Sequence, residues 1–386
     1  MQNNSITSSK PRYELLDGLR GVAALMVILY HFGEGFATSP VDQQINHGYL
    51  AVDFFFALSG FVLGYAYDDR WKNGMTSANF MLRRVIRLQP MVLIAVILGV
   101  IAFVIQGCEK WDGTGVSTTA IILSLLLGFF MIPSLPGSLP EIRGNGEMFP
   151  LNGPNWSLFF EYIGSILYAV FLHRLSKKAL KGVVIFNGAC LAALVLLNAS
   201  GTFHIGMGWS FGADGTWGIL GFIGGFFRMA FSFSIGLYLS RNFTPLKVRG
   251  AFWICTLIII AVLSVPYVTT NGEISILNAC YDLLCTLLIF PFVVYLGASG
   301  FTSDATSGRI CEFLGNISYP VYIIHYPAMY LFYSYVWKNG YSFSQVWYLC
   351  PIIFVAVILL AWFFMRFYDT PVRRYLTTKL LTRRPK

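Results

Sequence analysis

Two ionisable residues in the first apolar segment, Arg20 and His31, are of types that could do chemistry. They are eleven positions apart (31 − 20), almost three whole turns of an α-helix, and therefore share one helix face. The same spacing separates them by about 16 Å of helix rise, which excludes direct contact. A guanidinium at the edge of an apolar segment suits a phosphate group. An imidazole deep inside the segment is costly to bury and points to function.

Each of these residues also has a plainer interpretation. Arg20 could anchor its helix at a membrane surface, as basic residues at the ends of spanning helices do. His31 could form a hydrogen bond to a neighbouring helix. The two residues alone therefore leave their roles open.

Further ionisable side chains fall in later apolar segments. Asp53 lies in an aromatic run, where a carboxylate is costly unless it is paired. Glu161 falls well inside a segment that begins near Trp156, with Asn155 as the expected N-cap. This carboxylate could orient a substrate hydroxyl or neutralise an arginine. Several buried ionisable groups favour a polar cavity, because a single one is more easily a structural accident.

Two other polar residues have structural roles as their first interpretation. His325 lies in an aromatic segment that Pro320 and Pro327 interrupt, and we expect it to form a structural hydrogen bond. Ser59, beside Gly60, would allow another backbone to approach closely, so packing is its expected role.

A compact cationic group, Arg83, Arg84 and Arg87, precedes the third apolar segment. Arg84 and Arg87 are three residues apart and project together if the chain is helical there. The group could be a loop that fixes membrane topology. The alternative is a site for the polyphosphate group of a ligand.

The composition requires a membrane bundle to position these residues. Of the 386 residues, 56% are hydrophobic and 12% are charged, whereas soluble domains average roughly 25% charged residues. A soluble protein could not cover that much apolar surface. We therefore predict an all-α fold, a polytopic transmembrane helix bundle. Its apolar segments lie near residues 22–36, 51–67, 91–106, 117–132, 156–172, 182–199, 217–239, 251–268, 275–298, 314–336 and 346–367.

Basic residues predict the orientation of this bundle, since short cytoplasmic loops are enriched in lysine and arginine. Eleven crossings would place the two basic ends on opposite sides, so one segment must fail to span. The best candidate is 117–132, because it is short and runs into a Pro- and Gly-rich stretch at 133–154. We expect about ten spanning helices plus one re-entrant or non-spanning segment. Both termini should be cytoplasmic and the chain should lie in the inner (plasma) membrane.

The net charge of +9 fits membrane lipids as partners better than nucleic acid. Basic residues cluster near the end of the sequence, where they can lie against anionic headgroups. No nucleic-acid-binding motif accompanies the charge, so no nucleic acid is expected as a partner. The seven cysteines show no metal-binding spacing, and buried packing is their expected role.

Taken together, the motifs resemble the acyltransferase 3 family of integral membrane acyltransferases. The resemblance covers nearly the whole chain and rests on the order and spacing of the motifs rather than on one string. The matching features are Asp17-x-x-Arg20 with His31, Phe55-Phe56 before Leu58-Ser59-Gly60-Phe61, Arg84-x-x-Arg87, Trp156-Ser157-Leu158 with Glu161, and Ser318-Tyr319 before His325-x-Pro327. One departure is Asp369-Thr370-Pro371, where the family pattern has Glu.

The resemblance implies an O-acyltransferase that moves an acyl group, acetyl in the first instance, from acyl-CoA to a hydroxyl of an envelope carbohydrate or lipid-linked sugar. It implies His31 as the catalytic residue. Our hypothesis is that His31 acts as the general base, and we expect Glu161 to be a second catalytic residue. An acyl-histidine intermediate is the alternative mechanism. The donor, acetyl-CoA or another acyl-CoA, is expected at Arg20, Arg83, Arg84 and Arg87, and no cofactor is expected to be tightly bound. Substrate contact or structural support is expected from Asp17, Asp53, Ser59, Trp156, Tyr319 and His325.

This interpretation divides the chain into a disordered cytoplasmic tail at 1–12, a single transmembrane acyltransferase domain at 13–369 and a basic cytoplasmic tail at 370–386. The main alternative is a secondary transporter or polysaccharide-precursor translocase, since buried ionisable groups also build proton relays. Such transporters commonly contain repeated halves, and none is visible in this sequence. A non-catalytic scaffold would leave the buried ionisable groups without a purpose. The oligomeric state and the acceptor stay open, although the aromatic-rich stretch at 206–218 is a candidate contact for the acceptor.

Overall fold

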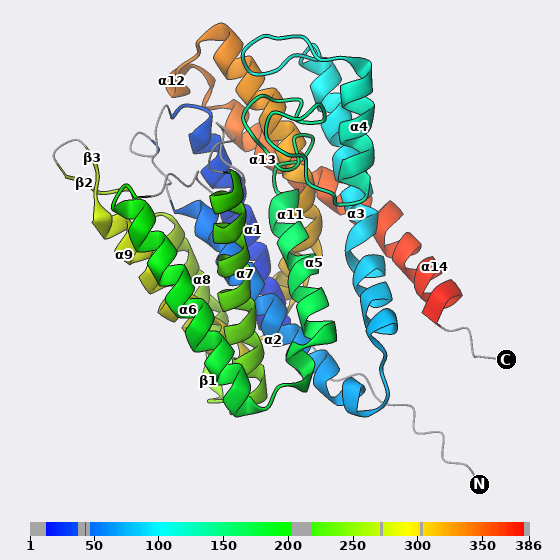
Figure 1. The fold of residues 1–386 in the computed structure, drawn as a ribbon, viewed down its shortest axis with the longest axis vertical. Helices are drawn as coiled ribbons and strands as arrows, with labels where there is room; N and C mark the ends of the chain where they lie inside the picture. The colour runs from blue at the N-terminus through cyan, green and yellow to red at the C-terminus, as the bar shows by residue number, and fades with distance from the viewer. Residues whose placement is uncertain are drawn as a thin grey trace.

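The structure, a computed structural model, describes residues 13–37, 43, 47–202, 218–270, 273–301 and 304–381. The tail at 1–12, the last residues of the basic tail at 382–386 and nearly all of the aromatic-rich stretch at 206–218 therefore lie outside the described residues. The described chain is an all-α bundle, as predicted, with its helices side by side along the long axis of the molecule (Figure 1).

The helices follow the apolar segments of the sequence closely. The α-helices are α1 (Glu14–Glu34), α2 (Ala51–Lys72), α3 (Ser77–Ile105), α4 (Thr118–Phe129), α5 (Asn155–Val170), α6 (Lys177–Ala199), α7 (Gly218–Arg241), α8 (Ala251–Leu263), α9 (Ile276–Leu284), α10 (Phe290–Ala298), α11 (Ala305–Asn339), α12 (Phe343–Val346), α13 (Leu349–Phe364) and α14 (Thr370–Leu381). Single π-helical turns, η4 (Cys285–Ile289) and η5 (Met365–Asp369), join α9 to α10 and α13 to α14. Short 3₁₀ segments, η1 (Gly48–Leu50) and η2 (Leu172–Arg174), lead into α2 and follow α5.

Two small pairs of strands connect helix ends. β1 (Val248–Arg249) pairs in parallel with β4 (Gly300–Phe301), with Val248 opposite Gly300. β2 (Thr269–Thr270) pairs in antiparallel with β3 (Glu273–Ile274). Each strand has only two residues, so these pairs fix connections and do not form a core.

Seven of the described helical stretches are long and apolar enough to span a membrane. Two apolar helices, α4 and α8, are shorter, and the 12 residues of α4 give about 18 Å of rise, too little for a hydrocarbon layer of about 30 Å. The 35-residue α11 is long enough but more polar. The expected membrane bundle is thus confirmed, whereas the expected ten crossings stay a prediction.

Small residues allow the central helices to pack backbone against backbone. A Cβ atom at Gly60 of α2 would collide with the Phe233 carbonyl of α7, and one at Gly236 of α7 would collide with the Ala57 carbonyl of α2. Gly21 of α1 meets the Leu314 backbone of α11 in the same way. The expectation that the position after Ser59 admits a close backbone approach is therefore confirmed.

Two local expectations are wrong. α11 runs without interruption through Pro320 and Pro327. The carbonyl of Ile323, which Pro327 leaves without its helical partner, accepts a hydrogen bond from Asn152 Nδ2 at 3.0 Å, so no break is required. Asn155 is not the N-cap of α5, because the helix begins at Asn155 and Pro154 occupies the N-cap position. The Asn155 side-chain oxygen instead accepts a hydrogen bond from the same Asn152 amide at 2.8 Å.

The two ends of the bundle differ in their side chains. The turns at 73–76, 171–176 and 242–250 lie together at the lower end in Figure 1, flanked by basic residues, and we call this end the basic face. The long connection at 130–154 lies at the opposite end, which we call the outer face (Figure 1). Helix α1 runs from the basic face toward the outer face.

Candidate active site

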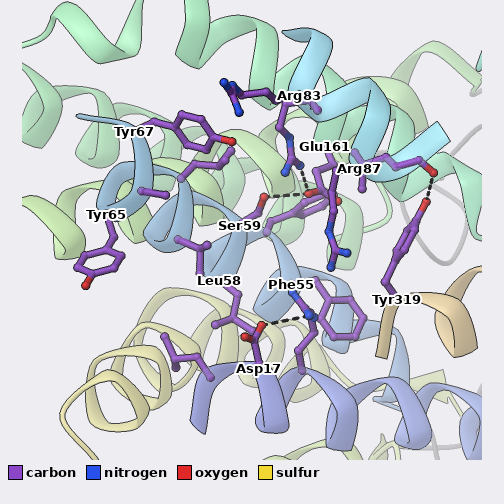
Figure 2. A pocket seen from close by; sticks show the side chains of 18 of the residues that line it. Asp17, Phe55, Leu58, Ser59, Tyr65, Tyr67, Arg83, Arg87, Glu161 and Tyr319 are labelled. Carbon is purple, nitrogen blue, oxygen red and sulfur yellow. Dashed lines mark hydrogen bonds and ion pairs between the residues drawn. The ribbon is translucent and has the colours of Figure 1, made fainter. Parts of the chain in front are cut away.

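A cavity of about 1170 Å³ opens among α1, α2, α3, α5 and α11, and we call it the arginine cavity. Its outer end lies at Ser157 and Tyr322, and its other end reaches the turn between α2 and α3 at Asn73, on the basic face. Figure 2 shows how α1, α2, α3, α5 and α11 each contribute side chains to it. Among the described residues its charged lining consists of Asp17, Arg20, Asp69, Arg70, Arg83, Arg84, Arg87, Glu161 and Arg373.

The cavity therefore has an excess of positive charge. Six arginines and three carboxylates line it, which gives a formal charge of +3 (6 − 3) from the described residues. All four arginines expected to bind the donor are among them, although they come from two helices, α1 and α3. Clustered guanidinium groups suit phosphate, because each offers several directed N–H donors. The cavity thus fits a ligand that carries several phosphates.

Glu161 is paired with an arginine in the structure, and the sequence had offered this pairing as one of two possible roles. It forms an ion pair with Arg84 and accepts a hydrogen bond from Ser59 Oγ at 2.9 Å. Arg84 Nε also donates to Ser165 Oγ at 3.1 Å. The network joins α2, α3 and α5 within the cavity wall, so Glu161 neutralises an arginine there and Ser59 supports it (Figure 2).

Arg20 joins α1 to α11 at the cavity, and Tyr319 joins α11 to α3. Arg20 Nε donates to Ser318 Oγ at 2.8 Å, and its terminal nitrogen lies 3.1 Å from the Asp17 carboxylate. Tyr319 donates to the carbonyl of Leu88 at 2.6 Å. In the cavity wall Asp17 thus pairs with Arg20 of its own helix, and Tyr319 bonds to α3.

Arg373, which the sequence did not single out, is a sixth cavity arginine. It lies on α14 and forms an ion pair with Asp369 at 2.9 Å. Asp369 is buried at the end of η5, so the acidic residue before Pro371 positions a cation at the cavity. The signal was present in the sequence as an acidic and a basic residue four positions apart.

His31 lies at the outer end of α1 in a second group of polar residues. Its Nδ1 is 2.5 Å from Glu34 Oε2, which also accepts a hydrogen bond from the Tyr333 hydroxyl at 2.9 Å. The same hydroxyl lies 2.8 Å from the His31 carbonyl. The His325 ring stacks on the His31 ring with 5.2 Å between centroids. A carboxylate at Nδ1 orients the imidazole and leaves Nε2 as its basic nitrogen.

Glu34 is the residue of this group that sequence reasoning missed. The available signal was its spacing of three residues from His31, which places both on one helix face. His325 is fully buried, and its Nδ1 lies 2.8 Å from the carbonyl of Tyr322. The expected structural hydrogen bond of His325 is thus present, and its ring in addition packs on His31.

The structure does not bring His31 and Glu161 together. Glu161 lines the arginine cavity, whereas His31 is absent from its described lining. Tyr322 lies at the cavity end, with its ring 6.0 Å from that of His325. The cavity therefore stops at Tyr322, short of the two histidines.

Asp53 belongs to a separate buried ion pair near the outer face, and Trp156 lies beside that pair. Arg228 of α7 donates to the Asp53 carboxylate of α2 at 3.0 and 2.5 Å and to the carbonyl of Tyr49 at 3.0 Å. Its guanidinium lies 5.4 Å from the Trp156 ring centre. Both Asp53 and Arg228 are buried. Their role is to join α2 to α7, and the sequence did not reveal Arg228 as the partner of Asp53.

The outer connection is held over the bundle by Arg143. This arginine is buried and donates to Gln106 at 2.8 Å and to the carbonyl of Pro150 at 2.6 Å. Its guanidinium lies 3.4 Å from the ring centre of Tyr330, whose hydroxyl donates to Glu147. Burial raises the pKa of the Glu147 carboxyl. The polar backbone of the stretch 133–154 thus has protein partners, as its position requires.

Fold and site define the class of protein: a polytopic helical membrane protein with a polycationic cavity open toward its basic face and a carboxylate-oriented histidine beyond the cavity end. The acyltransferase domain family matches residues 13–366. The match covers most of the chain, which therefore belongs to this family, acyltransferase 3, as its motifs indicated. It is an acyltransferase.

The chain is similar to three curated relatives, two of which are named as acyltransferases. The chain is 33% identical over 207 residues to protein 2 in the picA locus of Rhizobium radiobacter. This alignment covers 51% of this chain and 98% of that protein. It is 32% identical over 179 residues to the acyltransferase MdmB of Streptomyces mycarofaciens, covering 43% of this chain and 41% of the relative. It is 24% identical over 329 residues to the putative peptidoglycan O-acetyltransferase YrhL of Bacillus subtilis, covering 82% of this chain and 48% of the relative.

The matched region thus spans less than half of the length of the last two relatives. Their activities are therefore a guide for a proposal and not a description of this chain. No solved structure matches the protein.

Proposed function

We propose that this protein transfers an acyl group, acetyl in the first instance, from acyl-CoA to a hydroxyl of an envelope carbohydrate or lipid-linked sugar. The observation that carries the proposal is the arginine cavity, with its formal charge of +3 (6 − 3) and its volume of about 1170 Å³. A polyphosphate donor entering from the basic face would meet complementary charge along the cavity wall. The name of the Bacillus relative, a putative peptidoglycan O-acetyltransferase, supports transfer to oxygen.

We infer the orientation from the charge of the turns. The basic face would lie in the cytoplasm, where acyl-CoA is made and where short loops are rich in lysine and arginine. The outer face, with His31 and the connection at 130–154, would then receive the acceptor. About ten crossings of the inner membrane, with both termini cytoplasmic, would complete this arrangement.

The proposed chemistry assigns one task to each polar group. The arginines hold the phosphates of the donor, so that its thioester lies toward the outer end of the cavity. His31 Nε2 accepts the proton of the acceptor hydroxyl as the oxygen attacks the thioester carbonyl, and the CoA thiolate leaves. Glu34 holds the imidazole by Nδ1 and stabilises the imidazolium that forms. The imidazolium then returns its proton to the thiolate.

Replacing a cavity arginine should weaken donor binding selectively. We expect Arg87→Ala and Arg373→Ala each to raise the KM for acyl-CoA by roughly tenfold or more, since a hydrogen bond to a charged group contributes about 1.5–3 kcal/mol. Steady-state kinetics with purified protein in detergent would measure this effect. The matched control is Arg374→Ala, because Arg374 neighbours Arg373 but is exposed and outside the cavity lining. Equal KM values for Arg373→Ala and Arg374→Ala would contradict the assignment of Arg373.

The acceptor can be identified by mass spectrometry of envelope glycans. Cells with and without the gene should differ by one acyl unit on a glycan, and a His31→Ala copy should fail to restore it. Unchanged glycans alongside altered solute uptake would instead favour a transporter. This comparison tests the proposed reaction and names the acceptor in one measurement.

A further inference from the structure

We propose that the hydrogen bond between Ser157 and Tyr322 is a gate that closes the outer end of the arginine cavity and separates the donor from the two histidines. The inference rests on the proposed function, since a donor in the cavity must reach His31 for transfer to occur. It adds a step that the function alone does not require: the thioester reaches the histidines only after this contact opens.

The hydrogen bond between Ser157 and Tyr322 lies at the outer end of the arginine cavity. The hydroxyl groups of Ser157 on α5 and Tyr322 on α11 are 2.6 Å apart, and both residues line the cavity. The Phe55 ring meets the Tyr322 ring edge-on with 5.2 Å between centroids and closes the wall from α2. On the far side, His325 lies 6.0 Å from the Tyr322 ring, and His31 stacks on His325. One tyrosine ring therefore lies between the cavity and the histidine pair.

Polar atoms without partners flank this contact. His325 Nε2, three residues after Tyr322, and Asn155 Nδ2, two residues before Ser157, are both buried with no hydrogen-bond partner among the described residues. A buried polar atom left unpaired costs about 1–3 kcal/mol. An open gate would let the thioester carbonyl approach the Asn155 amide and the acceptor hydroxyl approach the imidazoles. These atoms are therefore placed to gain partners when the gate opens.

The contact is also weak enough to open. A neutral hydrogen bond contributes only about 0.5–1.5 kcal/mol net. Ser157 Oγ keeps a second partner, the carbonyl of Pro154 at 3.0 Å, when Tyr322 moves away. Opening the gate therefore leaves the Ser157 hydroxyl with a hydrogen-bond partner. A closed resting state would keep the thioester of acyl-CoA bound in the cavity away from His31, and so would limit hydrolysis.

Cysteine accessibility tests the gate without using acyl transfer. The reporter is His31→Cys in a chain whose seven native cysteines are replaced, labelled with a membrane-impermeant anionic methanethiosulfonate added only at the basic face of oriented vesicles. We expect slow labelling when Tyr322 is present and an increase of at least roughly tenfold with Tyr322→Ala. Tyr322→Phe, which keeps the ring but loses the hydroxyl, and Ser157→Ala should each give a smaller increase.

Ala66→Cys provides the matched control, because Ala66 lines the cavity on the basic side of the gate. It should label equally fast with or without Tyr322. A size-exclusion profile in detergent checks that each variant is folded. Unchanged labelling of His31→Cys in a folded Tyr322→Ala protein would overturn the gate. If Tyr322→Ala opened the path and Tyr322→Phe and Ser157→Ala did not, the ring would be the barrier and the role of the hydrogen bond would be refuted.

The gate and the proposed function fail in different ways. With His31 intact, the gate predicts that Tyr322→Phe raises acyl-CoA hydrolysis in the absence of acceptor, because water would reach the thioester and His31 together. If Tyr322→Ala speeds the labelling of His31→Cys but the protein with His31 intact never transfers an acyl group, the gate is supported and the proposed function is contradicted. Normal transfer with unchanged labelling would support the function and remove the gate.

Discussion

Replacing His31 with Ala should abolish acyl transfer while leaving the protein folded and inserted in the membrane. A general base contributes roughly 10²- to 10⁴-fold to the rate, so we expect kcat to fall by at least that range. The protein should stay folded because the His31 side chain is partly exposed and its ion pair with Glu34 lies at a helix end. Tyr333 bonds to the His31 backbone carbonyl, which the substitution keeps. Radiolabelled acetyl-CoA and the isolated acceptor would measure the residual rate.

Two companion variants separate catalysis from packing. Glu34→Gln keeps the size of the side chain but removes the charge beside His31 Nδ1, so we expect an intermediate loss of kcat with an unchanged KM for the donor. His173→Ala is the control, since His173 stacks on Trp71 away from the cavity and should leave kcat unchanged. Full activity in a folded His31→Ala protein would remove this residue from the mechanism.

Replacing Asp53 with Ala should destabilise the fold severely. The substitution leaves the Arg228 guanidinium buried without its carboxylate, and breaking a buried ion pair in this way costs about 3–5 kcal/mol. The pair joins α2 to α7, where Gly60 and Gly236 already bring the backbones into contact. Thermal unfolding in a mild detergent, monitored by circular dichroism, would show a large fall in Tm.

A double variant distinguishes an unpaired charge from a lost contact. Asp53→Leu combined with Arg228→Met removes both charges, so it should recover much of the stability that either single variant loses. Lys72→Ala is the control, because the Lys72–Asp69 ion pair is 78% and 54% exposed and such surface pairs contribute little. A Tm for Asp53→Ala within the error of the Lys72→Ala value would show that the buried pair does not hold the two helices together.

Local spacing was sufficient for part of the site. Arg20 and His31 lie on one continuous helix as their spacing predicted, and Arg84 and Arg87 both line the cavity. Each inference depended on residues less than four helical turns apart, where helix geometry alone fixes relative position. Glu34 is three residues after His31, so the same helix geometry would have placed the two side chains on one face.

Partners from distant segments could not be inferred in this way. Asp53 and its partner Arg228 are 175 residues apart, and Arg84 and Glu161 are 77 residues apart. The pairing of carboxylates with guanidinium groups depends on how the helices pack. Several different pairings would compensate equally for the cost of burying a charge. The spacing of Asp369 and Arg373 indicates their ion pair, but only the packing of α14 beside α3 brings Arg373 to the cavity.

Composition and motif order were enough to establish the class of this protein. The apolar segments are too numerous for a soluble core, and in lipid they must be helices that satisfy their own backbone groups. The motifs follow the order of one acyltransferase family. The packed bundle was needed to show that the arginines face one cavity and that His31 lies beyond its closed end, next to Glu34 and His325. Composition and periodicity act along a single helix, whereas a cavity and its end are formed by side chains from several helices at once. Their arrangement follows from close packing between helices, which no single segment encodes.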